Sequence, residues 1–211
     1  GADLTPELIA LFKENGVGRK SSLTCTVSPA LPFVELDPEK THSTEIQKVN
    51  GNIVYKGIVH AAQAALEAGI PVGLGTDSAC PYVTHYDMWR EVVYFQRHTG
   101  VTPEFALHTA TLKNAQLLGV ANETGSIETG KSADLIVLDA NPLNDLCALR
   151  NVEQVYMAGK PAKYKAKHLP KIDAELDGIM DGLDNDPFVS EWNIAGEKKS
   201  LNPFAKRGTK E

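Results

Sequence analysis

The stretch Ile70-Pro71-Val72-Gly73-Leu74-Gly75-Thr76-Asp77-Ser78 decides the fold. It is apolar on both faces over its first half, which is typical of a strand buried in a parallel sheet. If side chains alternate along it, Gly73, Gly75 and Asp77 share one face, and that face is empty beneath the carboxylate. Parallel α/β folds place their active sites at the carboxyl ends of the strands. The sequence therefore predicts that Asp77 either contacts a cation and takes a proton from water, or only caps the following loop.

The residues before this strand alternate between helix and strand patterns. Thr5-Pro6-Glu7 predicts a helix start, with a cap, a proline and an acidic residue in order, and Asn15-Gly16 ends that helix. Residues 22–27 predict a short strand, followed by an irregular segment rich in proline. A second helix is expected from about Asn52 to Gly69. This alternation predicts a parallel α/β domain.

The pattern changes after the central strand. Residues 88–95 place apolar side chains on one helix face, and another helix is expected from Thr102 to about Gly119. Residues 133–139 and 152–157 then predict two strands. We expect a boundary near residue 122, so that the predicted parts are residues 1–121, 122–162 and 163–211.

One segment matches a nucleotide-binding motif by its letters. Gly125-Ser126-Ile127-Glu128-Thr129-Gly130-Lys131-Ser132 fits the P-loop pattern GxxxxGK[ST]. A P-loop lies between a strand and a helix, and the start of that helix directs N–H groups at phosphate. Here the predicted order is helix and then strand, and Glu128 adds a negative charge. We therefore expect no nucleotide site in this segment.

The same residues carry a resemblance to a known family. Gly125-Ser126-Ile127, Gly130-Lys131 and residues 133–139 resemble the C-terminal signature of the amidohydrolase superfamily, where the chain leaves a (β/α)8 barrel for a small β-sandwich. Gly75-Thr76-Asp77 is similar to the end of the eighth barrel strand in that family. The helices expected at Thr102 and Thr5 resemble those after the eighth and sixth strands. These ordered matches extend over about residues 1–162.

The nearest subgroup contains the prolidase-like, Xaa-dipeptidase and imidazolonepropionase-like enzymes. The loop after residue 77 does not resemble the imidazolonepropionase form, so an amidase or dipeptidase is favoured. The implied fold is α/β, namely the last part of a (β/α)8 TIM-like barrel, with strands seven and eight, followed by part of a small β-sandwich.

The resemblance also implies chemistry. It implies metal-dependent hydrolysis of an amide or peptide-like C–N bond, with a divalent metal, zinc, as the cofactor. Asp77 would be both the catalytic carboxylate and a metal ligand, activating the hydrolytic water and passing its proton to the leaving amine. Ser78 and His85, in the loop that follows, would bind a small-molecule amide or dipeptide substrate.

Several parts of the family pattern have no counterpart in this sequence. The HxH pair of the first strand, the mid-barrel lysine ligand and the histidines of strands five and six are absent, and no HxH occurs anywhere. Two barrel units of eight cannot close a barrel. We therefore expect an incomplete part of a longer homo-oligomeric enzyme, inactive alone, whose partner is the missing N-terminal half. The alternative is a non-catalytic truncated fragment or a complementing assembly partner.

The remaining histidines show no functional pattern. We expect His60 and His108 to be packing or surface residues, and His98 and His168 to lie on the solvated surface. His42 is only a weak candidate for the pocket.

Composition excludes several classes of protein. The net charge of −6 and the lack of a basic stretch argue against binding to nucleic acid or to an anionic membrane surface. No apolar run approaches the roughly 20 residues of a membrane span, and Gly1-Ala2-Asp3-Leu4 does not resemble a signal peptide. Cys25, Cys80 and Cys147 lack the spacing of a disulfide framework or a cysteine zinc site. These features favour a cytoplasmic protein.

Residues 163–211 are expected to form a solvated, partly disordered polar extension. Ile172, Leu176 and Met180 could form one short amphipathic helix within it. Residues 181–186 are acidic but lack the ligand spacing of a calcium loop. Alternatively, Phe188 and Trp192 could anchor the extension on a neighbouring subunit.

Overall fold

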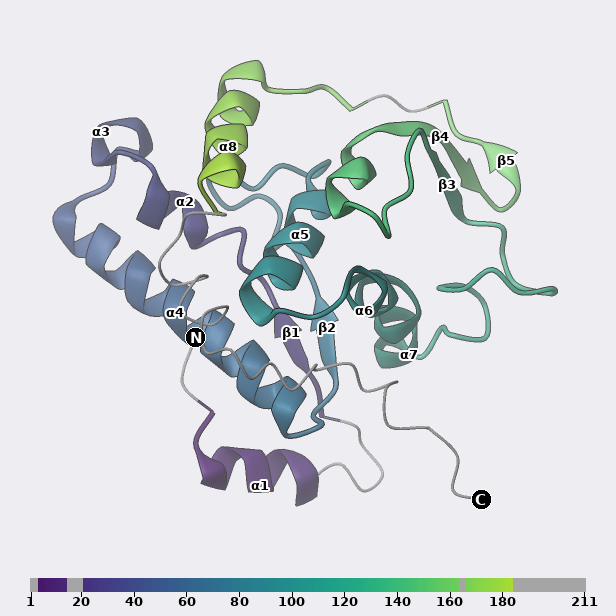
Figure 1. Cartoon of the computed structure of the whole chain (residues 1–211), viewed down its shortest axis with the longest axis horizontal. Coiled ribbons are helices and arrows are strands. Elements are labelled where there is room, and N and C mark those ends of the chain that lie inside the picture. Colours follow the sequence, from purple (N-terminus) through teal and green to yellow (C-terminus); the bar gives the residue numbers. More distant parts are fainter. Residues whose placement is uncertain (1–3, 15–20, 164–165, 184–211) are drawn as a thin grey trace.

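A pair of short parallel strands lies at the centre of the molecule (Figure 1). The computed structural model describes residues 4–14, 21–163 and 166–183. β1 (Leu23–Cys25) pairs with β2 (Val72–Leu74), and helix α4 (Glu45–Glu67) lies between them in the chain. The register sets Cys25 opposite Leu74, so the carboxyl ends of the two strands lie side by side. The predicted parallel pair is confirmed, although both strands are shorter than the sequence pattern indicated.

The segment between β1 and α4 is helical where we expected irregular structure. It forms α2 (Leu31–Glu35) and α3 (Pro38–Thr41), and α4 begins at Glu45 rather than near residue 52. The prolines occupy the first turns of these helices, where a missing N–H costs nothing. Thr44 and Gln47 form a capping box at the start of α4, with the Thr44 N–H donating to Gln47 Oε1 at 2.8 Å. The prediction was wrong because it treated these prolines as helix breakers.

Three helices and a single π-helical turn follow β2. They are α5 (Met88–Thr99), α6 (Pro103–His108), η1 (Thr109–Lys113) and α7 (Asn114–Leu118). Thr102 caps α6 as predicted, since its hydroxyl accepts the Phe105 N–H at 3.3 Å. Helix α4 contacts both strands, while η1 and α7 contact β2. The short sheet is therefore packed against one helix that precedes β2 in the chain and against helical segments that follow it.

Helix α1 (Pro6–Glu14) forms at the predicted place. It lies apart from the other helices, at the bottom of Figure 1, and none of its residues is buried. Its start is held by Thr5, whose hydroxyl accepts the Leu8 N–H at 3.4 Å. This helix therefore adds little to the core.

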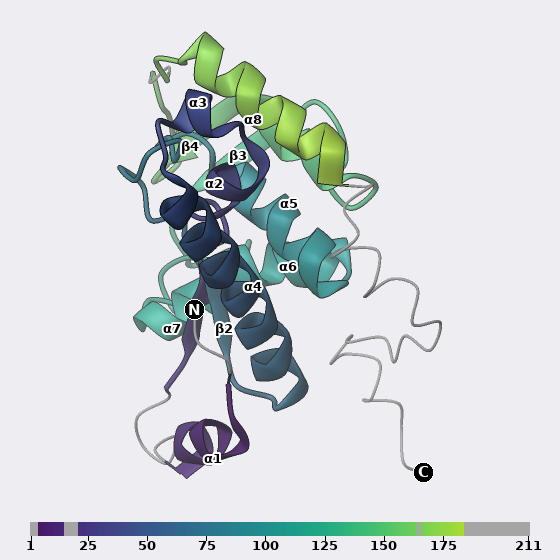
Figure 2. The same cartoon turned by 90° about the vertical axis from the view of Figure 1, so that its left-hand side faces the viewer.

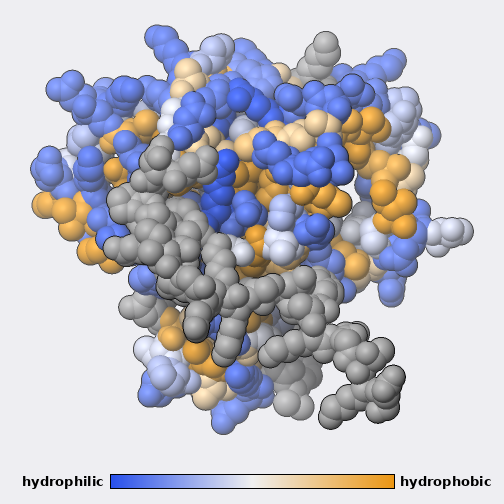
Figure 3. Space-filling view, in the orientation of Figure 1, coloured by the Kyte–Doolittle hydropathy of each residue, from blue (hydrophilic) through white to orange (hydrophobic). Residues whose placement is uncertain are grey.

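A second, antiparallel sheet lies at the other side of the molecule. β3 (Leu135–Leu138), β4 (Val152–Met157) and β5 (Lys160–Pro161) follow one another in it, with the 3-10 helix η2 (Leu146–Arg150) before β4. The two strands predicted here are confirmed. Apolar side chains on both faces stay exposed, for example the consecutive residues Ile136 at 50% and Val137 at 42%, and Figure 3 shows hydrophobic surface over this sheet at the right. A sheet of this kind is incomplete without a covering layer.

The C-terminal helix corrects our expectation for residues 163–211. α8 (Pro170–Gly182) packs on the core and buries Leu176, Ile179 and Met180, and Figure 2 shows it lying across α2, α3 and α5. The predicted amphipathic helix is confirmed, but a solvated extension is wrong for residues 170–183. Phe188, Trp192 and residues 184–186 of the acidic stretch lie outside the described residues.

An ion-pair network fastens α8 to α5. The Arg90 guanidinium is only 3% exposed and donates to Asp177 Oδ1 at 2.7 Å, and Arg150 donates to Asp177 Oδ2 at 2.8 Å. Arg90 also lies 3.3 Å from Asp87 and stacks on Trp89. A buried guanidinium requires such partners. The polar residues of α8 thus serve its attachment, which composition alone did not reveal.

None of the helices in the described parts of the chain has both the length and the apolar character needed to cross a membrane.

Candidate functional site

Asp77 lies on an exposed loop beyond the carboxyl end of β2. The strand ends at Leu74, and the backbone at Asp77 has a φ of 54°. Ala79 and Tyr82 also have positive φ, at 82° and 64°. Positive φ is uncommon outside glycine and is often found at functional sites. The loop therefore holds an exposed carboxylate on a constrained backbone.

The strand face beneath Asp77 is not empty, contrary to our expectation. A Cβ on Gly73 would lie 2.6 Å from Asn114 Oδ1 and 2.9 Å from Leu117 Cδ1. Asn114 fills this space and bonds both backbone groups of Leu74, accepting its N–H at 3.0 Å and donating to its carbonyl at 2.9 Å. The glycine admits the Asn114 side chain rather than leaving a hollow. Because β2 ends before Asp77, strand alternation also does not apply to that residue.

The contacts of Asp77 are few. The Cys80 thiol donates to Asp77 Oδ2 at 3.5 Å, a weak hydrogen bond. Partial burial, and then the hydrogen bond and charge of Asp77, raise the pKa of that thiol. In the described parts of the chain, no three His, Cys, Asp or Glu side chains are grouped so that they could hold a metal ion. The described residues of this chain therefore do not by themselves form a metal site.

Ser78 and His85 take different positions in the loop. Ser78 is exposed beside Asp77, and its hydroxyl lies 2.8 Å from Thr76 Oγ1. His85 packs edge-on against Tyr86, whose hydroxyl bonds Asp173 of α8 at 2.9 Å. The structure thus keeps Ser78 close to Asp77 and places His85 toward α8.

A buried carboxylate that the sequence analysis missed lies behind the neighbouring strand end. Glu91 of α5 is 0% exposed, and its oxygens accept the Val27 N–H at 2.7 Å and the Ser28 N–H at 2.8 Å. The Ser28 hydroxyl donates to the same carboxylate at 2.5 Å. Burial raises the pKa of Glu91 to about 7, against the lowering effect of these three hydrogen bonds. Its position beside Val92 and Phe95 in the apolar part of α5 was the available signal.

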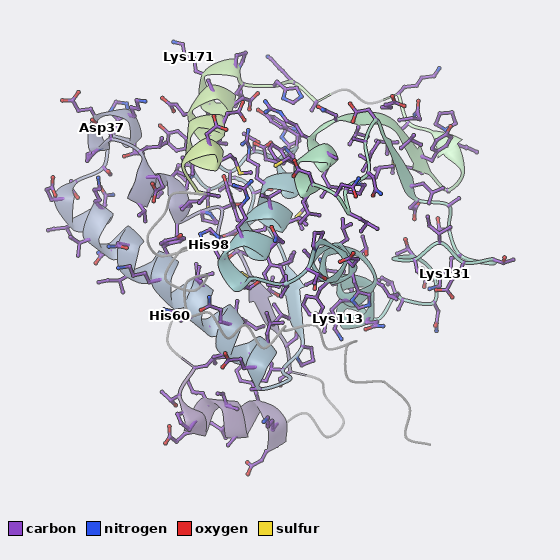
Figure 4. The ribbon with its side chains drawn as sticks, in the orientation of Figure 1. Asp37, His60, His98, Lys113, Lys131 and Lys171 are labelled. Carbon is purple, nitrogen blue, oxygen red and sulfur yellow. The ribbon has the colours of Figure 1, made fainter. Side chains whose placement is uncertain are left out.

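His98 is buried, not solvated as we expected. It is 2% exposed and lies between α4 and α5 (Figure 4). Its Nδ1 must donate to the Tyr94 carbonyl at 2.6 Å, so Nε2 accepts from the Tyr55 hydroxyl. The expectation overlooked that His98 follows Tyr94 by one helical turn on a buried face. This histidine fastens α5 to α4 rather than serving a site.

His60, His108 and His168 match their expected surroundings, whereas the place of His42 in a pocket stays a prediction. His42, His60 and His168 are exposed, and His108 is half-buried. Burial lowers the pKa of His108. None of these four groups lies in a metal-binding cluster of the described residues.

The segment that matches the P-loop pattern has a different geometry. Lys131 Nζ lies 3.1 Å from Glu128 Oε1 and also donates to Ser126, on the loop labelled in Figure 4. Strand β3 follows it, as predicted, instead of a helix. A Cβ on Gly125 would lie 2.6 Å from Ala115 Cβ, so this glycine serves packing against α7.

An open groove of about 420 Å³ lies between α2, α3 and α8. Leu36 and Ile179 line it together with Lys40 and Glu175. Asp77 is not among its lining residues, although Tyr82 of the same loop donates its hydroxyl to the carbonyl of the lining residue Lys40 at 2.8 Å.

Comparisons with known proteins show which family the chain resembles. The Amidohydrolase family model matches residues 34–162. The chain is 34% identical over 96 residues to an imidazolonepropionase of Thermoplasma acidophilum, covering 46% of this chain and 23% of that protein. A prolidase-like structure from Bifidobacterium longum superposes with a TM-score of 0.81 at 43% identity, covering 85% of this chain and 45% of that one.

A Xaa-Pro dipeptidase structure with bound methionine is also similar, with a TM-score of 0.63 at 32% identity over 76% of this chain and 38% of that one. The chain therefore spans about a quarter of the curated relative from Thermoplasma and less than half of these two solved structures. On the family match and these similarities, the chain belongs to the amidohydrolase family, on its prolidase-like and imidazolonepropionase-like side.

Proposed function

We propose that this chain contributes to a metal-dependent hydrolase that cleaves an amide or peptide-like C–N bond. The observation that carries the proposal is the exposed carboxylate of Asp77 at the carboxyl end of β2, in a chain of the amidohydrolase family. An exposed carboxylate at this end can ligate a cation or accept a proton from water. Asp77 is thus the residue to which we assign both roles.

The fold part of the proposal concerns which portion of the enzyme the chain supplies. β1 and β2 would be the seventh and eighth strands of a (β/α)8 barrel, and β3 to β5 part of a small β-sandwich. The exposed apolar faces of the second sheet support this, because a sandwich would cover them. We keep the division at residue 122, and assign α8 to the barrel part because it packs on α5.

The metal would be a divalent cation, and zinc is our proposal. Bound at such a site it would polarise the substrate carbonyl. Asp77 alone does not make this site, and the described residues offer no cluster that completes it. We therefore propose that the other ligands come from residues outside this chain and derive no step that passes through the metal.

The substrate class follows from the relatives. The similarity to a prolidase-like protein and to a Xaa-Pro dipeptidase supports a dipeptide or another small amide. Ser78 lies beside Asp77 and is the nearer candidate for contact with substrate. His85 is the more distant candidate, since its neighbour Tyr86 is bonded to α8. All three cysteines are free thiols, which suits the reducing cytoplasm that we propose as the site of action.

One observation favours a second candidate function. The chain covers 45% of the prolidase-like structure, and its described residues contain no group of three His, Cys, Asp or Glu side chains that could hold a metal ion. A chain of this kind, made alone, would be a non-catalytic fragment, or an assembly partner that complements an N-terminal half. In either case we expect no hydrolysis and no stoichiometric zinc from the 211-residue chain by itself.

The test is Asp77→Asn in the native-length protein that contains this chain, assayed on dipeptides and simple amides. We expect kcat to fall by about 10² to 10⁴-fold. The melting temperature should hardly change, because the side chain is exposed. Asp139→Asn is the matched control, since Asp139 is an exposed carboxylate directly after β3, away from the loop of Asp77. Full activity in Asp77→Asn would refute the assignment.

A further inference from the structure

Glu91 is a buried carboxylate whose two oxygens are both used by one short stretch of backbone. Oε1 accepts the Val27 N–H, and Oε2 accepts the N–H and the hydroxyl of Ser28. The side chain is 0% exposed, so its ionised form is costly to bury. Such a group persists in a core when its acceptors satisfy donors that nothing else reaches.

The stretch that it holds is the turn directly after β1. Val27 and Ser28 lie beyond the end of the strand at Cys25, so their N–H groups bond the carboxylate instead of a neighbouring strand. The Val27 carbonyl in turn accepts the N–H groups of Ala30 and Leu31, which start α2. Glu91 therefore sets the point at which the chain leaves β1 and turns into α2.

This turn adjoins the loop of Asp77. The register places Cys25 opposite Leu74, and the Gly75 N–H donates to the Cys25 carbonyl at 3.1 Å. The residues after β1 and those after β2 therefore leave the sheet at the same end, where the carboxyl ends of both strands lie. A shift of the turn at Val27 would therefore displace a segment that lies next to the loop of Asp77.

We propose that Glu91 is a positioning residue of the candidate site: it fixes the Val27–Ser28 turn against α5 and so holds the wall of the substrate pocket beside Asp77. The part of this inference that concerns the substrate rests on the proposed function. The contacts between Glu91 and the Val27–Ser28 turn, which we call the latch, involve only residues of the described chain.

The groups around Glu91 do not offer it a replacement partner. The Cys25 thiol of β1 and the Tyr94 phenol of α5 both have raised pKa values, in each case chiefly from burial and in part from the charge of Glu91. Arg90, the neighbouring cation on α5, is directed to Asp177 and Asp87. The turn is therefore the element that Glu91 holds.

The first experiment measures amide hydrogen exchange residue by residue in the 211-residue chain, for wild type and for Glu91→Gln. The amide side chain keeps the shape of the carboxylate but replaces one acceptor with a donor. We expect the Val27 and Ser28 N–H groups to exchange about tenfold faster relative to the amides of α4. Thr99→Val is the matched control, because Thr99 is buried on the same helix and bonds only the Phe95 carbonyl there. It should leave the turn unchanged.

Two results would overturn the latch. One is unchanged relative exchange at Val27 and Ser28 in Glu91→Gln, and the other is faster exchange at every amide alike. If Glu91→Gln does not fold, Ser28→Ala removes a single contact from the other side, and its Val27 and Ser28 amides must show the same local acceleration.

The pocket part is tested in the native-length protein with a dipeptide substrate. A displaced wall predicts a KM about tenfold higher for Glu91→Gln, with kcat within about threefold of wild type. Faster local exchange with both constants unchanged would overturn the positioning role. Absence of any hydrolysis by the wild type would instead overturn the proposed function and leave the latch result standing.

Discussion

The two strand ends at the centre of the fold are built in opposite ways. The turn after β1 is buried, and its Val27 and Ser28 donors are taken up by the Glu91 carboxylate. The loop after β2 is exposed, carries three non-glycine residues with positive φ, and leaves Asp77 with one weak hydrogen bond. Neighbouring strands in one sheet thus end in a closed interior and in an open loop.

The two strand ends differ in how far residues of this chain bond their polar groups. At the β1 end the Val27 and Ser28 donors bond Glu91 of this same chain, so we expect that end to behave as a folded core. At the β2 end the Asp77 carboxylate is exposed, and the described residues form no metal-binding cluster around it. The hydrogen bonds to Val27 and Ser28 at one end, and the single weak hydrogen bond to the Asp77 side chain at the other, express this difference.

The largest expected contrast is between Cys25 and Cys80, one thiol at each end. Cys25 is 2% exposed and burial raises its pKa well above the usual value, whereas Cys80 is half-buried in the loop of Asp77. A thiol reagent at pH 8 should label Cys80 at least about 10³ times faster, because Cys25 reacts only when the fold opens. Similar rates for the two thiols, followed by mass spectrometry, would show that the β1 end is not closed.

The same labelling assay also tests the contact between Asp77 and Cys80 in the loop after β2. Asp77→Asn removes the charge that contributes to the raised pKa of Cys80, so its thiolate fraction and labelling rate should increase at pH 8. Labelling of Cys147 serves as the internal control. An unchanged Cys80 rate would mean that the two side chains do not meet in solution.

The next effect is the pH dependence of stability from Glu91. Its pKa is raised from 4.5 to about 7 on folding, so the folded chain binds this proton more tightly and protonation favours folding. The stabilisation is complete below about pH 4.5 and is lost as the pH rises to about 7, a change of about 3 kcal/mol. Urea unfolding of wild type and Glu91→Gln at pH 4.5 and pH 8 should show the difference in unfolding free energy changing by this amount. A constant difference would contradict the raised pKa.

A matched pair of serines gives the third effect. Ser28→Ala removes a buried hydroxyl from the Glu91 carboxylate and should lower the free energy of unfolding by about 2 kcal/mol. Ser78→Ala makes the same chemical change on the exposed loop and should stay within about 0.5 kcal/mol. Equal losses, measured by denaturant titration at pH 8, would remove the distinction between the two strand ends.

The smallest effect concerns the backbone of the open loop. Ala79 has a φ of 82°, which an alanine adopts at a cost and a glycine adopts freely. Ala79→Gly should therefore leave the free energy of unfolding unchanged or raise it by less than about 1 kcal/mol, whereas glycine in α4 at Ala62 should lower it. A clear loss of stability in Ala79→Gly would show that the loop relaxes to another conformation in solution.

The sequence predicted the features that depend on local pattern. The parallel pair, the helix cap at Thr102 and the strands at 133–139 and 152–157 follow from periodicity and short motifs, and the resemblance of those motifs to a known family predicted the family. The amphipathic spacing of Ile172, Leu176 and Met180 also predicted α8 correctly. These signals lie within a few turns of one another in the chain.

What the sequence missed depends on contacts between distant residues. Glu91 bonds Ser28 across 63 positions, Asn114 bonds Leu74 across 40, and Arg90 bonds Asp177 across 87. A buried carboxylate or guanidinium has the same letter as an exposed one, so only the fold distinguishes them. The position of Asp77 at a strand end could be predicted, but the filled face beneath it could not.

The intact mass of the natural protein, captured by an antibody raised against this chain, tests directly whether the chain is part of a longer metal-dependent hydrolase. Since the chain covers 45% of the prolidase-like structure, we expect a mass roughly twice the 22.8 kDa of these 211 residues, consistent with an upstream part that supplies the remaining metal ligands. A natural protein of about 22.8 kDa would contradict the enzymatic account and leave the non-catalytic or complementing chain as the function.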